Sequence, residues 1–141
     1  AFAKNLPMIA VGSLASMAVA ARDGNPETLL LPMIDARRME VYCQGIDGLG
    51  QIQFETRAQV LDENSFPEAA NFQKVFFFGD GAEKCREIYE PMGWEFQNLD
   101  ASSEGMAVLA FEKFQKSDFV SVAYFEPFYL KDFVAGKPKK K

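Results

Sequence analysis

The chain has 141 residues, the length of one domain, and 48% of them are hydrophobic, which is enough for a core. Its formal net charge is −5, and without the four lysines of the basic tail at 137–141 it holds 11 basic against 20 acidic residues, or −9. Such an acidic body disfavours extended contact with nucleic-acid phosphates, which requires clusters of Lys and Arg. The sequence has no histidine, the commonest general base and metal ligand, and no metal-ligand spacing, so it predicts neither a catalytic centre nor a metal site.

The first apolar stretch imitates a targeting signal, because Lys4 precedes a mostly apolar run at 6–21. Pro7 and a Gly-Ser pair interrupt the run, and a membrane span needs about 20 apolar residues. We therefore predict no membrane segment, but a short strand at 8–11 and a helix at 14–22 capped by Ser13. Because the chain begins with Ala1, we also expect it to be the C-terminal part of a longer protein.

Three antiparallel strands are predicted next. Residues 29–34 are apolar at every position, which is typical of a strand covered on both faces. The charged residues at 35–38 form a polar tip, and 41–42 resume a strand pattern. After a glycine-rich turn at 45–50, residues 51–60 alternate between apolar and polar, which predicts a half-exposed strand with Arg57 facing outward.

The second half alternates strands and helices. A buried strand at 74–78 runs into a glycine turn and a helix at 82–90, with Asp80 and Glu83 at capping-box spacing and Lys84 facing water. A strand at 94–99 precedes a helix at 104–115, capped by Ser102 or Ser103. The aromatic segment at 120–134 is expected to wrap onto the core. We predict one α/β domain over 1–136, a mixed sheet with helices on both faces, followed by a disordered tail at 137–141.

The glycine turn Gly79, Asp80 and Gly81 is the candidate cofactor site. A strand that ends in a glycine turn before a helix can point backbone N–H groups at a phosphate. The same residues also make a purely structural turn, and Asp80 places a negative charge where a phosphate would lie. A purely structural turn is therefore favoured. If the turn does bind a ligand, a nucleotide is the candidate.

Asp35, Arg37 and Arg38 form the second candidate site, a partner contact at the hairpin tip. Polar groups clustered at a strand end often mark a site, whereas a hairpin corner held by local ion pairs has the same composition. Cys43 and Cys85 fall on apolar positions without a CxxC spacing, which predicts two buried thiols in a reducing compartment. The serines have no histidine partner, so nucleophilic catalysis finds no support.

Four segments resemble motifs of the TsaB (YeaZ) family, whose members were once labelled glycoprotease-like. Residues 33–42 are similar to its (I)DAR-x-x-EVY hairpin, with Met39 where relatives often carry Gly. Residues 6–14 resemble its P-hydrophobic-x-V-[GS]-[ST]-L segment, 78–82 its glycine turn, and 126–130 its P-x-Y-L ending. The four segments occur in the family's order and span nearly the whole chain.

The resemblance implies the C-terminal half of an actin-like, sugar-kinase-like ATPase (ASKHA) fold, with the N-terminal subdomain absent. It implies a cytoplasmic, non-catalytic scaffold that binds a TsaD-like catalytic subunit and a TsaE-like ATPase, and that reaches tRNA indirectly, in the synthesis of threonylcarbamoyladenosine. Half of an ATP-binding phosphotransferase is the alternative, with ATP or ADP at a partner interface. A homodimer is a further expectation, through an apolar patch at 14–21.

Overall fold

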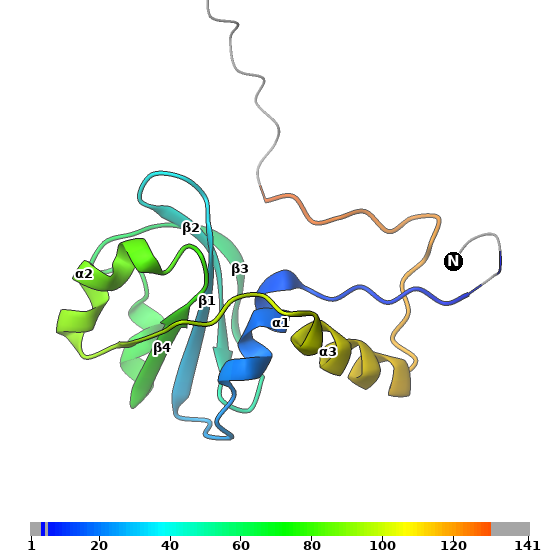
Figure 1. Cartoon of the computed structure of the whole chain (residues 1–141), viewed down its shortest axis with the longest axis horizontal. Coiled ribbons are helices and arrows are strands. Elements are labelled where there is room, and N and C mark those ends of the chain that lie inside the picture. The colour runs from blue at the N-terminus through cyan, green and yellow to red at the C-terminus, as the bar shows by residue number, and fades with distance from the viewer. Residues whose placement is uncertain (1–3, 5, 131–141) are drawn as a thin grey trace, which may run out of the picture.

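The computed structural model describes residue 4 and residues 6–130, and its centre is a mixed five-stranded sheet (Figure 1). The strands are β1 (Thr28–Asp35), β2 (Glu40–Asp47), β3 (Ile52–Val60), β4 (Lys74–Phe78) and β5 (Glu95–Gln97), in the order β3-β2-β1-β4-β5. β1, β2 and β3 pair antiparallel, whereas β4 lies parallel to both β1 and β5. The predicted α/β class and the three successive antiparallel strands are confirmed.

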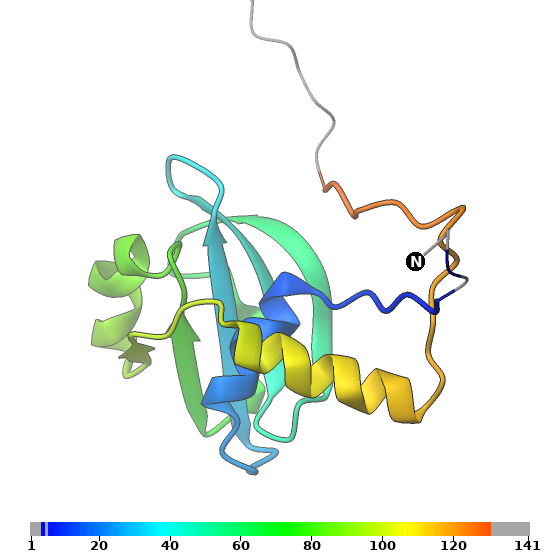
Figure 2. The same ribbon diagram turned by 45° about the vertical axis from the view of Figure 1, so that its right-hand side comes forward.

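Helices cover both faces of this sheet. α1 (Ser13–Ala18), η2 (Val19–Ala21) and α3 (Ser103–Gln115) lie on one side, and α2 (Arg86–Tyr89) lies on the other, as Figures 1 and 2 show. The 3₁₀ segments η4 (Glu83–Cys85) and η5 (Glu90–Met92) flank α2, and η3 (Pro67–Asn71) connects β3 to β4. The chain from β4 through α2 to β5 is thus a strand–helix–strand unit with parallel strands.

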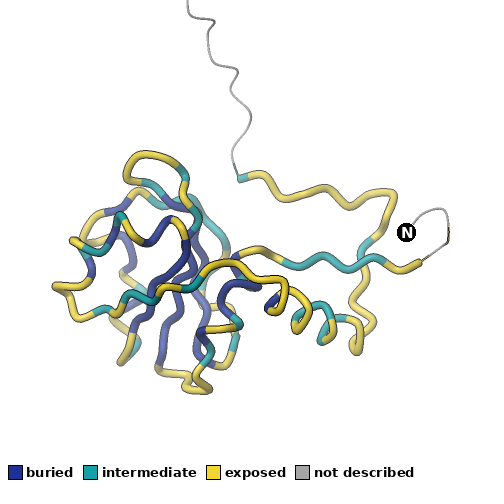
Figure 3. Tube along the Cα trace, viewed as in Figure 1, coloured by how far each residue is buried: buried dark blue, intermediate teal, exposed yellow. Residues whose placement is uncertain are grey.

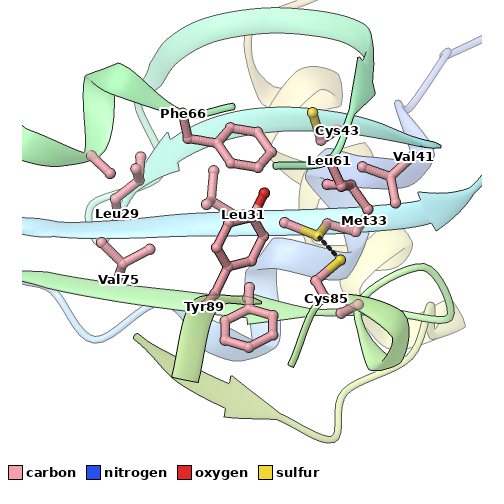
Figure 4. Close-up of a cluster of buried hydrophobic side chains, with 13 residues drawn as sticks. Leu29, Leu31, Met33, Val41, Cys43, Leu61, Phe66, Val75, Cys85 and Tyr89 are labelled. Carbon is pink, nitrogen blue, oxygen red and sulfur yellow. Dashed lines mark hydrogen bonds between the residues drawn. The ribbon is translucent and has the colours of Figure 1, made fainter. Parts of the chain in front are cut away.

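Each central strand supplies two cores, because successive side chains of a strand point to opposite faces. On β1, Leu29, Leu31 and Met33 pack toward α2, while Leu30 packs toward α1. Figure 4 shows the first of these cores, in which Tyr89 of α2 is buried beside the β1 side chains. Two-sided burial explains why the sequence of β1 is apolar without alternation.

The predicted alternation of β3 is only partly right. The pairing of β2 with β3 shifts between Cys43 and Gly45 and again between Gly45 and Ile46. An extra residue of this kind reverses which face the following side chains take. Arg57 was expected to face water, but its guanidinium lies 4.1 Å from the ring centre of Phe54.

Several details expected of the N-terminal segment and of the helices are wrong. The segment 8–11 forms one bridge, Met8 with Val120, and not a strand. Gly12, not Ser13, is the N-cap of α1, without a side-chain hydrogen bond. The expected helix at 82–90 is divided into η4, α2 and η5, and Asp80 caps nothing there. By contrast, Ser102 caps α3 as predicted, accepting a hydrogen bond from the N–H of Gly105 at 3.2 Å.

The burial of the C-terminal part also differs from the expectation (Figure 3). Residues 120–130 were expected to wrap onto the core, yet Tyr124 is 87% exposed and Tyr129 is 81% exposed. The expected exposed patch at 14–21 is instead mostly buried, with Ala18 fully covered and Ala20 exposed. The remaining residues of the expected wrap, 131–134, and the tail at 137–141 lie outside the described residues.

Candidate functional site

The two candidate sites meet in space at one corner of the sheet. β1 and β4 are parallel neighbours, so the glycine turn after β4 and the hairpin tip after β1 leave the sheet at the same edge. The carboxylate of Asp80 accepts a hydrogen bond from the backbone N–H of Asp35 at 3.1 Å. The sequence predicted two separate sites, and the structure brings part of each together.

Lys84 is the residue that holds this corner, and sequence reasoning placed it in water. Its ammonium donates to the carboxylate of Asp35, to the carbonyl of Arg38 at 2.8 Å and to the carbonyl of Glu40 at 2.6 Å. The bond from Lys84 holds the pKa of Asp35 below its ordinary value of 3.8. Asp35 therefore acts inside the fold, as an acceptor for Lys84.

The glycine turn packs directly against β1. A Cβ at Gly79, whose φ is 101°, would lie 2.3 Å from the carbonyl oxygen of Met33, and a Cβ at Gly81 would lie 2.8 Å from the carbonyl carbon of Ile34. The N–H of Gly81 donates to Met33 at 3.1 Å, and the N–H of Ala82 donates to Gly79 at 3.0 Å. These N–H groups are engaged in the fold, so the geometry favours the structural alternative; nucleotide binding stays a prediction.

Arg37 and Arg38 are placed differently from Asp35. Both have positive φ, 67° and 50°, and both side chains are exposed. Left-handed backbone costs an ordinary residue about 1–2 kcal/mol. Met39 does not need the Gly that relatives often carry, because the left-handed positions of this turn are Arg37 and Arg38.

Comparison with known structures identifies the fold. The chain is similar to YeaZ from Pseudomonas aeruginosa across 92% of its own length, with a TM-score of 0.68 and 24% identity. A second structure, an uncharacterized protein with similarity to peptidase YeaZ from Pseudomonas aeruginosa, gives a TM-score of 0.67 and 25% identity over the same share. The chain thus has the fold of YeaZ. The chain spans 62% of the length of each of these two structures.

This likeness confirms the resemblance to the TsaB (YeaZ) family and the ASKHA-like fold that it implied. No protein-family model matches the sequence, and no curated protein does. Within residues 4 and 6–130, no helix is long and apolar enough to cross a membrane. The same residues contain no cluster of three His, Cys, Asp or Glu side chains that could hold a metal ion.

The two thiols of this YeaZ-like fold are buried, as predicted. Burial raises the pKa of Cys43 to about 12 and that of Cys85 to about 11. The Cys85 thiol contacts the carbonyl of Gly81 at 3.3 Å and the sulfur of Met33 at 3.7 Å (Figure 4). Thiols with raised pKa values are poor nucleophiles, so both cysteines serve packing.

Arg57 is a second structural cation that the sequence pattern missed. It forms two hydrogen bonds with Glu68, at 2.7 and 3.2 Å, and its guanidinium lies over the ring of Phe54. The bonded guanidinium holds the pKa of Glu68 below its ordinary value of 4.5. This pair fastens the loop after β3 to the aromatic core and does not create a reactive group.

The main exposed feature of the YeaZ-like fold is an aromatic surface on α3 and the segment that follows it. Gly105 packs α3 so closely on α1 that a Cβ there would lie 2.1 Å from the carbonyl oxygen of Ser16. Beyond this contact the large apolar side chains Met106, Phe111 and Phe114 of α3 are exposed, and Phe114 contacts Phe119 of the next segment. Exposed apolar side chains that occur together in number mark interaction sites. We define the aromatic surface by eight residues that are each at least 41% exposed: Met106, Phe111, Phe114, Phe119, Tyr124, Phe125, Phe128 and Tyr129.

Proposed function

We propose that this chain belongs to a non-catalytic scaffolding subunit of an assembly that makes threonylcarbamoyladenosine in tRNA. The fold shared with YeaZ over 92% of the chain carries the proposal. The partners are a TsaD-like catalytic subunit and a TsaE-like ATPase, and tRNA is reached through them. Because the chain spans 62% of the YeaZ structures, the activity and the partners of the whole protein are part of this proposal.

The aromatic surface supports a role in binding proteins. Phe111 is 61% exposed and Phe114 is 56% exposed, although both lie in the middle and last turns of a helix that already packs on α1. Exposed aromatic residues are enriched where proteins associate, because they bury a large area at a small cost in conformational entropy. The surface therefore fits a docking face for a partner subunit.

The corner favours a scaffold over the alternative, half of an ATP-binding phosphotransferase. The N–H groups of Gly81 and Ala82 donate to backbone carbonyls of the protein itself. A phosphate would have to break these bonds, and the carboxylate of Asp80 beside them would repel it. Titration of the full-length protein with ATP tests this alternative, which micromolar binding would favour.

The experiment that tests the scaffold is a binding titration of the full-length protein with purified TsaD-like and TsaE-like proteins of the same organism. The unmodified protein is expected to bind at least one of them and to be required for tRNA modification in the reconstituted mixture. A Phe111→Ser, Phe114→Ser double variant is expected to weaken that binding tenfold or more, since buried aromatic anchors dominate interfaces.

Leu49→Ser is the matched control, because Leu49 is 52% exposed in the turn before β3 and outside the aromatic surface. It should change the affinity less than twofold. If the unmodified protein binds neither subunit, the proposed function is wrong. If the double variant instead loses folding stability and keeps its affinity, the aromatic surface is covered within its own chain.

A further inference from the structure

The hairpin tip between β1 and β2 is an unusual turn. Figures 1 and 2 show it projecting beyond the edge of the sheet, and the N–H of Ala36 closes it by donating to the carbonyl of Glu40 at 3.1 Å. Two consecutive residues, Arg37 and Arg38, have left-handed backbone. Turns of this kind strongly prefer Asn and Gly, which adopt positive φ with little strain. The chain thus carries two arginines where smaller residues would be more stable.

The backbone of the tip is held in place from below. Lys84 binds the carbonyls on both sides of Met39, those of Arg38 and Glu40. The carboxylate of Asp35 accepts from the N–H of Arg37 at 3.2 Å. These bonds fix the backbone of the tip, and with it the direction in which each side chain leaves the turn, so the turn itself is ordered before any binding event.

The side chains of the tip, in contrast, are unpaired. The guanidinium groups of Arg37 and Arg38 make no hydrogen bond or ion pair with any residue in the described ranges, and Arg37 adds only a minor electrostatic contribution to the lowered pKa of Asp35. Met39 between them and β2 is 42% exposed. Arg and Met are enriched in protein interfaces relative to the rest of the surface.

The charge of the surroundings separates two kinds of partner. The chain carries 20 acidic against 15 basic residues, and the hollow along α2 is lined by three glutamates, Glu83, Glu87 and Glu90, with the two cations Lys84 and Arg86 between them, so acidic side chains are in slight excess there. The long phosphate row of a nucleic acid would meet this acidic surface as well as the tip. Individual carboxylates on a protein can instead pair with the two forked guanidiniums alone.

We propose that Arg37, Arg38 and Met39 form a preformed knob that inserts into an apolar pocket rimmed by Asp or Glu carboxylates on a partner protein. Met39 fills the pocket, and the two arginines pair with carboxylates at its rim. The inference rests on the proposed function for the proteins to be tried, the TsaD-like and TsaE-like subunits. It adds a second contact, separate from the aromatic surface.

The test compares three variants of the full-length protein, each titrated calorimetrically with the two purified subunits. Arg37→Gln and Arg38→Gln are each expected to weaken binding to one subunit about tenfold, and to reduce the salt dependence of that affinity. Lys74→Gln removes the same charge near the opposite end of β1, where Thr28 pairs with Lys74, and should change the affinity less than twofold.

An Arg37→Gly, Arg38→Gly double variant separates binding from folding. Glycine accepts both positive φ angles, so the variant should melt at a higher temperature than the unmodified protein, yet bind about a hundredfold more weakly. A purely structural role for the arginines predicts no loss of affinity in this well-folded variant, and that result would overturn the knob.

Two further outcomes are decisive. Unmodified protein that binds a subunit with an affinity insensitive to the arginine variants overturns the knob and leaves the proposed function standing, whereas binding to neither subunit overturns both. A parallel titration with tRNA, followed by fluorescence anisotropy, completes the set. Loss of tRNA affinity in the arginine variants without loss of subunit affinity would assign the tip to RNA and overturn the protein pocket.

Discussion

The corner and the aromatic surface use side chains in opposite ways. At the corner, charged groups that a surface could leave in water are paired inside the protein: Lys84 alone makes three hydrogen bonds and Asp80 fixes the β1 backbone. On α3 and residues 119–129, side chains that a core would cover are left in water, with Phe128 77% exposed. Paired polar groups determine the shape of the fold, and unpaired apolar groups are available to a partner.

The hairpin tip stands between these two cases. Its backbone is part of the corner, because Lys84 and Asp35 bind it, whereas the guanidiniums of Arg37 and Arg38 make no hydrogen bond or ion pair with the described residues. The same few residues are therefore structural through their backbone and exposed through their side chains. Variants that separate backbone from side-chain effects can sharpen this division.

The largest expected effect comes from Gly79→Ala at the corner. The change forces an L side chain to a φ of 101° and places its Cβ 2.3 Å from the carbonyl oxygen of Met33. Strain and overpacking together should lower the free energy of unfolding by about 3 kcal/mol, measured by urea denaturation. Gly24→Ala is the matched control, since Gly24 has a φ of 76° but nothing within 4 Å of its Cβ position.

Gly24→Ala should cost about 1 kcal/mol, the backbone strain alone. If the two substitutions destabilise the protein equally, the close approach of the glycine turn to β1 is not what holds the corner. The corner would then be packed less tightly than the structure indicates.

Lys84→Met gives the next largest effect. Methionine keeps much of the apolar stem but leaves the carbonyls of Arg38 and Glu40 and the carboxylate of Asp35 without their shared donor. Loss of these charge-assisted bonds at a partly exposed site should destabilise the protein by about 2 kcal/mol in the same assay.

Lys116→Met is the control for Lys84, because Lys116 is exposed and its side chain makes no hydrogen bond or ion pair with another described residue. It should stay within about 0.5 kcal/mol of the unmodified protein. If Lys84→Met and Lys116→Met lower the free energy of unfolding equally, the hydrogen bonds of Lys84 contribute nothing beyond what an exposed lysine contributes.

The sequence predicts the two halves of this comparison unequally well. β1 and β4 were predicted because short runs of apolar residues are typical of strands covered on both faces, and the side-chain cap of Ser102 depends on neighbouring residues alone. Lys84 was missed because its acceptors lie 46 and 44 residues away, on a strand whose position depends on the whole sheet. The residues close to Lys84 in the sequence do not indicate which distant residues it binds.

Two other errors have equally definite causes. Arg57 faces the core because an irregularity in the pairing of β2 with β3 reverses the expected side, and the signal for it is weak, a glycine, Gly45, inside the opposite strand. The apolar residues of α3 recur at helical spacing, which is typical of a face that packs on a core, although Met106 is 52% exposed. A helix face that meets a partner has the same period as one that meets its own sheet, so periodicity cannot separate them.

The smallest expected effect is a loss of stability in acid, which comes from the paired polar groups of the sheet and not from the aromatic surface. The folded-state pKa values of Asp35 and Glu68 lie below their ordinary values of 3.8 and 4.5, because Lys84 and Arg57, respectively, donate to them. Their stabilising contribution is present above those ordinary values and is lost as the pH falls through the lowered ones, since the unfolded chain then binds more protons. The free energy of unfolding should therefore decline below about pH 4.5.

Asp35→Asn isolates the share of the corner in this acid response. The variant should be slightly less stable at neutral pH, and below pH 3.8 its stability should fall less steeply than that of the unmodified protein. Lys84→Met should flatten the same range, because the bond from Lys84 is the largest cause of the lowered pKa, and combining the two changes should add little. If denaturation curves at several pH values instead show the same slope for Asp35→Asn and the unmodified protein, the Asp35–Lys84 pair does not couple protonation to folding, and the corner is held by its neutral hydrogen bonds and glycine packing alone.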